Sequence, residues 1–312
     1  MQWQTIITIP AFTRQMNYHT PVLFTGSCFA SNMGDAMRQR KFPVTINPFG
    51  VAYNPQSIVQ ALQRLRNGNP FEEQELICCR GLWTTFSHHS SFSHPNAAAF
   101  LQQANAALQK GQEIFRCASF LVVSLGTSWA YRHKEKNTIV ANCHKFPATD
   151  FERVFLPAEE TAELFAREIA ADPSRTWIFT VSPVRHWKDG AHGNQLSKAS
   201  LLLAVEKLQQ QFPNVRYFPA YEIMMDELRD YRFYAGDMLH PSVQAVNYIW
   251  QRFSDVALDG DTKKIMREVE QIITAQQHRP LHEDTEAHRK FLTDTHRKIQ
   301  DFSARYPFIH FL

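Results

Sequence analysis

Apolar residues along the chain gather in five short, nearly continuous runs, and each run is followed by small or polar residues. Runs that are apolar at successive positions are typical of parallel strands buried on both faces. In chain order, the five runs cover residues 21–25, 42–46, 120–125, 176–181 and 215–219.

Between these runs, apolar residues recur every three or four positions, as on one face of a helix. Ile58, Leu62 and Leu65 follow this spacing, and a similar stripe extends over residues 201–212. A third stripe follows Pro241 and Ser242, a typical helix start. Strands that alternate with helices predict a doubly wound parallel sheet in a three-layer α/β/α arrangement. In such sheets, ligands bind at the carboxyl ends of the strands.

The pattern changes from residue 257. Ile265, Val269 and Ile272 continue a helical stripe, and the charged stretch 283–302 carries its apolar residues on one side. We therefore expect an α/β sheet domain over residues 1–256 and a helical extension over residues 257–312. This extension would pack on the domain or on a partner chain, and in the second case it would form an oligomer contact.

Charge and composition exclude several classes of protein. The 33 basic and 30 acidic residues leave a net charge of only +3, which does not indicate nucleic-acid binding. No apolar stretch is long enough to cross a membrane, and the first residues lack the pattern of a signal peptide. The five cysteines contain no CxxC pair, and their odd number argues against a framework of disulfide bonds. A reduced, cytoplasmic protein is the expectation.

The first candidate for chemistry is the turn Gly26-Ser27-Cys28 after the first apolar run. A glycine turn between a strand and a helix exposes the serine hydroxyl above the sheet, and the helix N-terminus favours negative charge there. The ordinary alternative is that Ser27 only caps the helix. Cys28 could also be considered as the nucleophile, since a helix N-terminus would lower its pKa. We favour a buried structural role for it, because adjacent side chains on a tight turn point apart and the turn selects Ser27.

The second candidate is Asp237, three residues before His240 in a turn ahead of a helix. This spacing lets the carboxylate accept a hydrogen bond from Nδ1 of His240 and leaves Nε2 free to act as a base. Alone, such a pair is a weak motif, but its place after the last strand makes it informative.

The remaining 13 histidines show no HExxH motif and no carboxylate–histidine set with ligand spacing. We therefore expect neither a metal nor a cofactor. Four residues are candidates to line the mouth of the site: Asn47, His89, Arg185 and His186. Arg185 would bind an anionic part of the substrate or form a salt bridge within the fold. Lys198 is interpreted as a solvated charge near a helix start.

These segments resemble the GSCFA family, which belongs to the SGNH/GDSL esterase–lipase superfamily. The motif Gly26-Ser27-Cys28-Phe29-Ala30 carries the family's name, and similar segments follow in the family's order. They are residues 47–55, 124–128, 182–186 and 231–237. The resemblance covers about residues 21–255 and implies a flavodoxin-like sheet.

The resemblance also implies roles. Ser27 matches the nucleophile, and Asp237 and His240 match its partners. The backbone N–H groups of Ser27 and Gly50 would form the oxyanion hole. The superfamily's third donor is an asparagine, and here Ser128 stands in its place beside Thr127. Either of these hydroxyls would donate, or an amide such as Asn47 or Asn142 would replace them.

The function implied is a serine esterase with a Ser-His-Asp triad and an acyl-enzyme intermediate. Its substrate would be a small acyl ester such as an acetyl ester, with acylated sugars included. Two alternatives stay open. One is an acyltransferase, in which a sugar hydroxyl replaces water. The other is a catalytically inactive scaffold that binds a ligand in the same crevice, favoured by the departure at Ser128.

Overall fold

The computed structural model describes residues 4–282 and 284–311. All five predicted strands form one parallel sheet, so this prediction is confirmed. They are β1 (Val22–Gly26), β2 (Val44–Ile46), β5 (Phe120–Leu125), β9 (Thr176–Val181) and β10 (Val215–Tyr217).

The strands lie in the order β2-β1-β5-β9-β10, and every neighbouring pair is parallel. This is the flavodoxin-like order, in which the chain first builds one half of the sheet and then the other. The switch point lies between β1 and β5, where the carboxyl ends of two strands leave a crevice. The turn after β1, which contains Ser27 and Cys28, therefore opens at this point.

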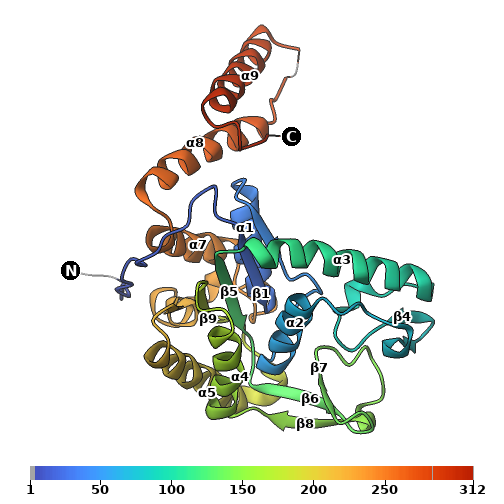
Figure 1. Ribbon diagram of the computed structural model, residues 1–312. Helices are drawn as coiled ribbons and strands as arrows, with labels where there is room; N and C mark the ends of the chain where they lie inside the picture. Colours follow the sequence, from blue (N-terminus) through green and yellow to red (C-terminus); the bar gives the residue numbers. More distant parts are fainter. Residues whose placement is uncertain (1–3, 283, 312) are drawn as a thin grey trace.

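Helices cover both faces of the sheet (Figure 1). The two faces have separate cores because successive strand residues alternate between them. Val22, Phe24 and Val122 pack with α1 and α7, whereas Leu23 and Leu121 pack with α2, α3, α4 and α5. The three-layer α/β/α prediction is thus confirmed. These helices are α1 (Cys28–Gln39), α2 (Pro55–Asn67), α3 (Ala97–Cys117), α4 (Ala158–Ala170), α5 (Gly190–Gln211) and α7 (Val243–Ala257).

Two small antiparallel elements were not predicted. A three-stranded sheet forms from β6 (Trp129–His133), β7 (Thr138–Val140) and β8 (Phe151–Phe155), and a hairpin forms from β3 (Ile77–Cys79) and β4 (Leu82–Thr84). Their strands are only three to five residues long, so none of them carries a long apolar run. Residues 220–227 add one turn, α6 (Ala220–Glu222), followed by a π-helical turn.

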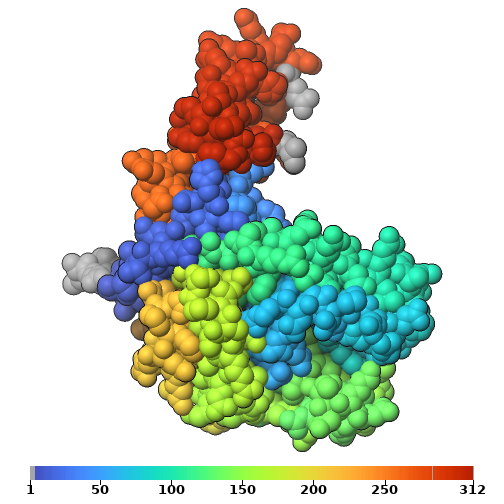
Figure 2. Space-filling model, viewed as in Figure 1, coloured from blue at the N-terminus to red at the C-terminus, as the bar shows by residue number. Residues whose placement is uncertain are grey.

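The C-terminal part forms two helices, as predicted: α8 (Gly260–Gln276) and α9 (Glu286–Arg305). Glu283, where we placed the start of the second helix, lies outside the described residues. Figures 1 and 2 show the two helices (orange to red) standing out from the rounded body. Their apolar residues continue the core under α1 and α7, and Arg40 at the end of α1 pairs with Glu270 of α8 at 2.6 Å.

Candidate active site

The turn between β1 and α1 is possible only with glycine at position 26. The Gly26 backbone has φ +121°, and a Cβ there would lie 2.1 Å from the carbonyl oxygen of Ser124 in β5. The missing side chain therefore lets the end of β1 lie against β5. The backbone N–H of Gly26 donates to Oδ1 of Asn47 at 2.8 Å, which fixes the turn from the other side.

Ser27 caps α1. Its Oγ accepts a hydrogen bond from the backbone N–H of Phe29 at 3.2 Å and lies 2.8 Å from Oγ of Ser124. Its own N–H donates to the carbonyl oxygen of Ser124 at 2.9 Å, and the residue is only 1% exposed. The hydroxyl is therefore turned toward the sheet. This differs from the exposed position that we predicted for Ser27, and it matches the capping alternative.

Asp237 and His240 lie in one turn, with Oδ2 of the carboxylate 2.6 Å from Nδ1 of the imidazole. The other carboxylate oxygen accepts from the N–H groups of Leu239 and His240, at 2.9 and 3.0 Å. These N–H groups and the imidazole together lower the pKa of Asp237 to about 2. Because the carboxylate stays ionised, it accepts from Nδ1–H and leaves Nε2 of His240 available as a proton acceptor.

The turn is held in an unusual conformation. Met238 has φ +60°, which is uncommon for a non-glycine residue. The turn is fixed at both ends, because Ala235 donates to the carbonyl oxygen of His240 at 2.7 Å and Arg185 donates to that of Leu239 at 3.2 Å. The second contact ties the His240 turn to the loop after β9.

His240 lines a cavity of about 680 Å³ at the carboxyl edge of the sheet, which we call the His240 cavity. Its other lining residues include Cys28, Tyr53, Thr127 and His186. Of the two candidates on the β1–α1 turn, Cys28 is among the described residues that line this cavity and Ser27 is not. Cys28 is half-buried, and it lies close enough to Asp237 for that carboxylate to raise its pKa.

Lys198 of α5 lies under this site and is only 1% exposed. Its ammonium donates to the carbonyl oxygens of Gly126, after β5, and Ser182, after β9, both at 2.7 Å. Burial lowers the pKa of Lys198 to about 7, and the nearby Cys28 opposes that shift. Our interpretation of Lys198 as a solvated surface charge is therefore wrong. It is a buried cation that joins two strand ends beside Cys28.

The predicted oxyanion donors already have acceptors. The N–H groups of Ser27 and Gly50 donate to the carbonyl oxygens of Ser124 and Asn47, at 2.9 and 2.8 Å, and the hydroxyl of Thr127 lies 3.0 Å from that of Ser197. Both the N–H and the hydroxyl of Ser128 bond to Ser197, and this residue is fully buried. Ser128 thus serves the contact between its loop and α5.

One N–H group at the site is available. Apart from the adjacent thiol, no group among the described residues accepts a hydrogen bond from the N–H of Cys28. This group is the first N–H of α1, where the helix dipole favours negative charge. The side chain of Asn142 also lines the His240 cavity, but its amide donates to Ser90 at 3.0 Å.

Of the four predicted mouth residues, three line the His240 cavity, and the fourth, Asn47, has a structural role. Asn47 is buried and holds the β1–α1 turn, with its amide donating to Ser31 at 2.9 Å. His89 lines the His240 cavity, and its Nδ1 accepts from the N–H of Ser91. A Cβ on Gly50, whose φ is +85°, would lie 2.3 Å from Cβ of His89, so glycine is required where these two loops meet.

His186 and Arg185 face the site from the loop after β9. Burial lowers the pKa of His186 to about 3, and its Nε2 is buried without a hydrogen-bond partner among the described residues. The guanidinium of Arg185 lies over the ring of Trp187 at 5.5 Å. None of the ion pairs between described residues involves Arg185, so its charge faces the cavities without a carboxylate partner.

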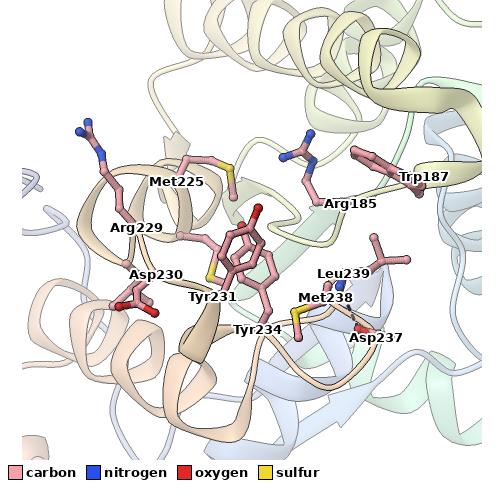
Figure 3. Close-up of a pocket in the computed structure, with 12 residues that line it drawn as sticks. Arg185, Trp187, Met225, Arg229, Asp230, Tyr231, Tyr234, Asp237, Met238 and Leu239 are labelled. Atoms are coloured by element: carbon pink, nitrogen blue, oxygen red, sulfur yellow. Dashed lines mark hydrogen bonds between the residues drawn. The ribbon is translucent and has the colours of Figure 1, made fainter.

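A second cavity, of about 600 Å³, lies on the other side of the His240 turn, and we call it the Tyr231 pocket. Figure 3 shows the rings of Tyr231 and Tyr234 next to Met238, across from Arg185 and Trp187. Arg185 and Trp187 line both cavities, whereas Asp237 lines this one and His240 the other. The Asp237–His240 pair therefore lies between two cavities, and the cationic side chain of Arg185 lines both of them.

Over residues 4–282 and 284–311, no group of three or more His, Cys, Asp or Glu side chains has the arrangement of a metal site. Within the same residues, no helix has the length and apolar character needed to cross a membrane.

Two site residues, Cys28 and Lys198, were given other roles in the sequence analysis, although the sequence carries signals for their positions. Serine is a preferred N-cap, so a helix starting at Cys28 puts Cys28 at its first position, where the side chain projects outward. Lys198 directly follows Ser197 and lies four residues after Asn194, and both of these polar residues are buried. A lysine inside a buried helix face indicates a partner, and here the partners are carbonyl oxygens that no sequence pattern reveals.

Comparison with known families gives two matches. A profile of the GSCFA family matches residues 21–253, and a profile described as the C-terminal domain of GSCFA domain proteins matches residues 269–312. A search of curated proteins returned no match. The first match includes the β1–α1 turn and the Asp237–His240 turn, and the second begins within α8.

Proposed function

The chain belongs to the GSCFA family, and we propose that it is an acyl hydrolase that works by covalent nucleophilic catalysis, in the manner of SGNH esterases. One observation carries the proposal. His240 is oriented by Asp237 at 2.6 Å and shares a cavity with the β1–α1 turn at the switch point of the sheet. A base and a nucleophile at that edge are what acyl transfer requires.

In this mechanism, Nε2 of His240 removes a proton from the nucleophile as it attacks an ester carbonyl. Asp237 holds the imidazole in the correct tautomer and stabilises its cationic form. His240 then protonates the leaving alcohol, and water activated by His240 releases the acid. The nucleophile comes from the β1–α1 turn, on which Ser27 and Cys28 are the two candidates.

The substrate we propose is a small acyl ester that carries a negative charge. Arg185 supports this choice, because its guanidinium lines both cavities and has no carboxylate partner among the described residues. Tyr231, Tyr234 and Met238 supply apolar surface beside it. Such a wall suits a substrate with a short apolar part and a carboxylate or other anionic group.

A second candidate function is acyl transfer to an alcohol. It is favoured by the two cavities of about 600 and 680 Å³ on either side of the His240 turn, which offer separate places for an acyl donor and an acceptor hydroxyl. A sugar hydroxyl would then replace water in the second step.

The test is turnover of p-nitrophenyl acetate by the purified full chain, with and without added alcohols. We expect His240→Ala to reduce kcat ~10²–10⁴-fold, as loss of a general base does. Asp237→Asn should reduce kcat by up to ~10⁴-fold while the protein stays folded. His94→Ala is the control, because His94 lies on the surface near β4 and should leave kcat unchanged. If the wild type and His240→Ala are equally inactive, the binding-scaffold alternative is favoured instead.

A further inference from the structure

The turn after β1 offers two nucleophiles, and the structure separates them by direction. The Ser27 hydroxyl is buried, caps α1 through the N–H of Phe29 and lies against Ser124. It would have to break both contacts to reach a substrate. The next residue, Cys28, lines the His240 cavity together with His240 itself.

We propose that Cys28, and not Ser27, is the nucleophile, so that the site is a Cys28–His240–Asp237 triad. This inference rests on the proposed acyl hydrolase function and names its reacting atom. Ser27 is then a positioning residue, which holds the helix start so that the Cys28 side chain projects into the cavity.

The surroundings of the thiol determine how it is activated. Burial raises the pKa of Cys28, while the Lys198 cation and the N–H groups of Phe29 and Cys28 act in the opposite direction. Asp237 adds a negative charge that raises the pKa, and Tyr53 is the neighbouring phenol. The resting thiol is therefore protonated at neutral pH, so it needs His240 to remove its proton at the moment of attack.

The reaction balances with water as the only co-reactant. His240 accepts the thiol proton, sulfur forms a bond to the acyl carbon, and the bond between that carbon and the alkoxy oxygen breaks. The alkoxide leaves with the proton from His240, and a thioester remains on Cys28. Water then gives a proton to His240 and hydroxide to the acyl carbon, the carbon–sulfur bond breaks, and the proton returns to the thiolate.

The free N–H of Cys28 completes this arrangement. It belongs to the nucleophile itself, at the positive end of α1, and apart from the adjacent thiol it has no acceptor among the described residues. During attack by sulfur, the carbonyl oxygen of the substrate comes within reach of this group. It therefore serves as an oxyanion donor, in the place of the N–H groups of Ser27 and Gly50 that are already bonded.

The first experiment follows alkylation by iodoacetamide, with each cysteine resolved by peptide mass spectrometry. It needs no substrate. We expect His240→Ala to slow the labelling of Cys28 at pH 7 at least ~10-fold, because the base that deprotonates the thiol is lost. Cys143 is the internal control, since it is a half-buried thiol in the same cavity and should react at an unchanged rate. Equal labelling of Cys28 in the two proteins would overturn the proposal.

The second experiment identifies the acylated residue after a brief exposure to p-nitrophenyl acetate. We expect one acetyl group on Cys28, and a loss of kcat on the order of 10³-fold or more in Cys28→Ala. Ser27→Ala should still be acetylated at Cys28, although more slowly because the helix start is less well held, and its thermal stability should be lower because the cap is lost. Cys78→Ala is the matched control, because Cys78 is an exposed cysteine on β3, and this variant should keep its kcat.

The outcomes separate a failure of the proposed nucleophile from a failure of the proposed hydrolase function. Acetylation of Ser27, or full turnover by Cys28→Ala, would contradict the role of Cys28 while keeping the hydrolase. A stable acetyl–Cys28 thioester without turnover would support the nucleophile and contradict hydrolysis. If an added alcohol then removes the acetyl group, the acyltransferase is supported.

Discussion

Lys198 donates from Nζ to the carbonyl oxygen of Ser182 at 2.7 Å, and it donates to Gly126 at the same distance. The two oxygens follow β9 and β5, which are adjacent strands of the sheet, so a single buried ammonium joins neighbouring strand ends near Cys28. A charge so deeply buried is costly unless it is hydrogen-bonded. The nearby thiol of Cys28 gives this charge a second effect, which can be measured.

Lys198→Met should make the Cys28 thiol harder to ionise. The cation lowers the pKa of Cys28, and methionine keeps the length and apolar stem of the side chain without the charge. Because burial lowers the pKa of Lys198 to about 7, this effect is confined to the pH range in which Lys198 carries its charge, and in that range alkylation of Cys28 should be slower in the variant. Alkylation rates measured from pH 6 to 10 test this, since the two proteins should differ at the acidic end and converge toward pH 10.

Lys207→Met is the matched control, because Lys207 lies on the same helix but is exposed and pairs with Glu159. Lys207→Met should leave the pH dependence of Cys28 alkylation unchanged. If Lys198→Met and Lys207→Met give the same profile as the wild type, Lys198 serves only to join the strand ends. A lower thermal stability in Lys198→Met alone would then be its sole consequence.

Arg185→Met should discriminate between substrates by charge. Hydrogen bonds to charged groups contribute about 1.5–3 kcal/mol, so KM for the p-nitrophenyl monoester of succinic acid should rise ~10–100-fold. KM for p-nitrophenyl acetate should change by less than about 3-fold, because this ester has no charge for Arg185 to bind. Steady-state kinetics with both esters measures the difference.

Arg229→Met gives the comparison for this prediction. Arg229 also lines the Tyr231 pocket, but Asp226 pairs with it at 3.0 Å and neutralises its charge locally. Its loss should raise KM for the charged ester much less than the loss of Arg185. An equal rise for both esters in Arg185→Met would mean that Arg185 acts through the shape of the pocket and not through its charge.

The sheet was predictable because its strands are buried on both faces, and burial is what apolar runs record. Trp177 and Phe179 illustrate this, since both are fully buried in β9. The small sheet of β6, β7 and β8 was not predictable in this way. Half-exposed residues such as Arg132 and Arg153 interrupt its strands, so the sequence there has no continuous apolar run.

The site was predictable in part for a related reason. The contact of Asp237 with His240 follows from a local turn of four residues, which spacing alone can suggest. The direction of the Ser27 hydroxyl depends on Ser124, which is 97 residues away in the chain and adjacent only in the folded sheet. Likewise, the acceptors of Lys198 are backbone oxygens 72 and 16 residues away, and backbone atoms leave no trace in the sequence.

Acid should destabilise the fold through buried neutral histidines. His88 is fully buried among the rings of Phe49, Phe71, Phe92 and Phe100, and its Nδ1 lies 2.7 Å from the hydroxyl of Thr85. Burial lowers the pKa of His88 to about 3, from 6.5 in the unfolded chain. Between these values the unfolded state binds the extra proton, so stability falls as the pH drops below about 6.5.

For one such histidine, the free energy of unfolding should fall by about 1 kcal/mol between pH 6 and pH 5. His186, whose pKa burial also lowers to about 3, should add a similar amount. Urea unfolding of the wild type and of His88→Phe at both pH values tests this. Phenylalanine suits the aromatic surroundings and does not titrate, so the variant should lose about 1 kcal/mol less on acidification.

His278→Phe is the control for this prediction, because His278 lies at an exposed position near Phe291. If His88→Phe and the wild type lose stability equally, the imidazole is already solvated or protonated in the native protein, and the acid sensitivity has another origin.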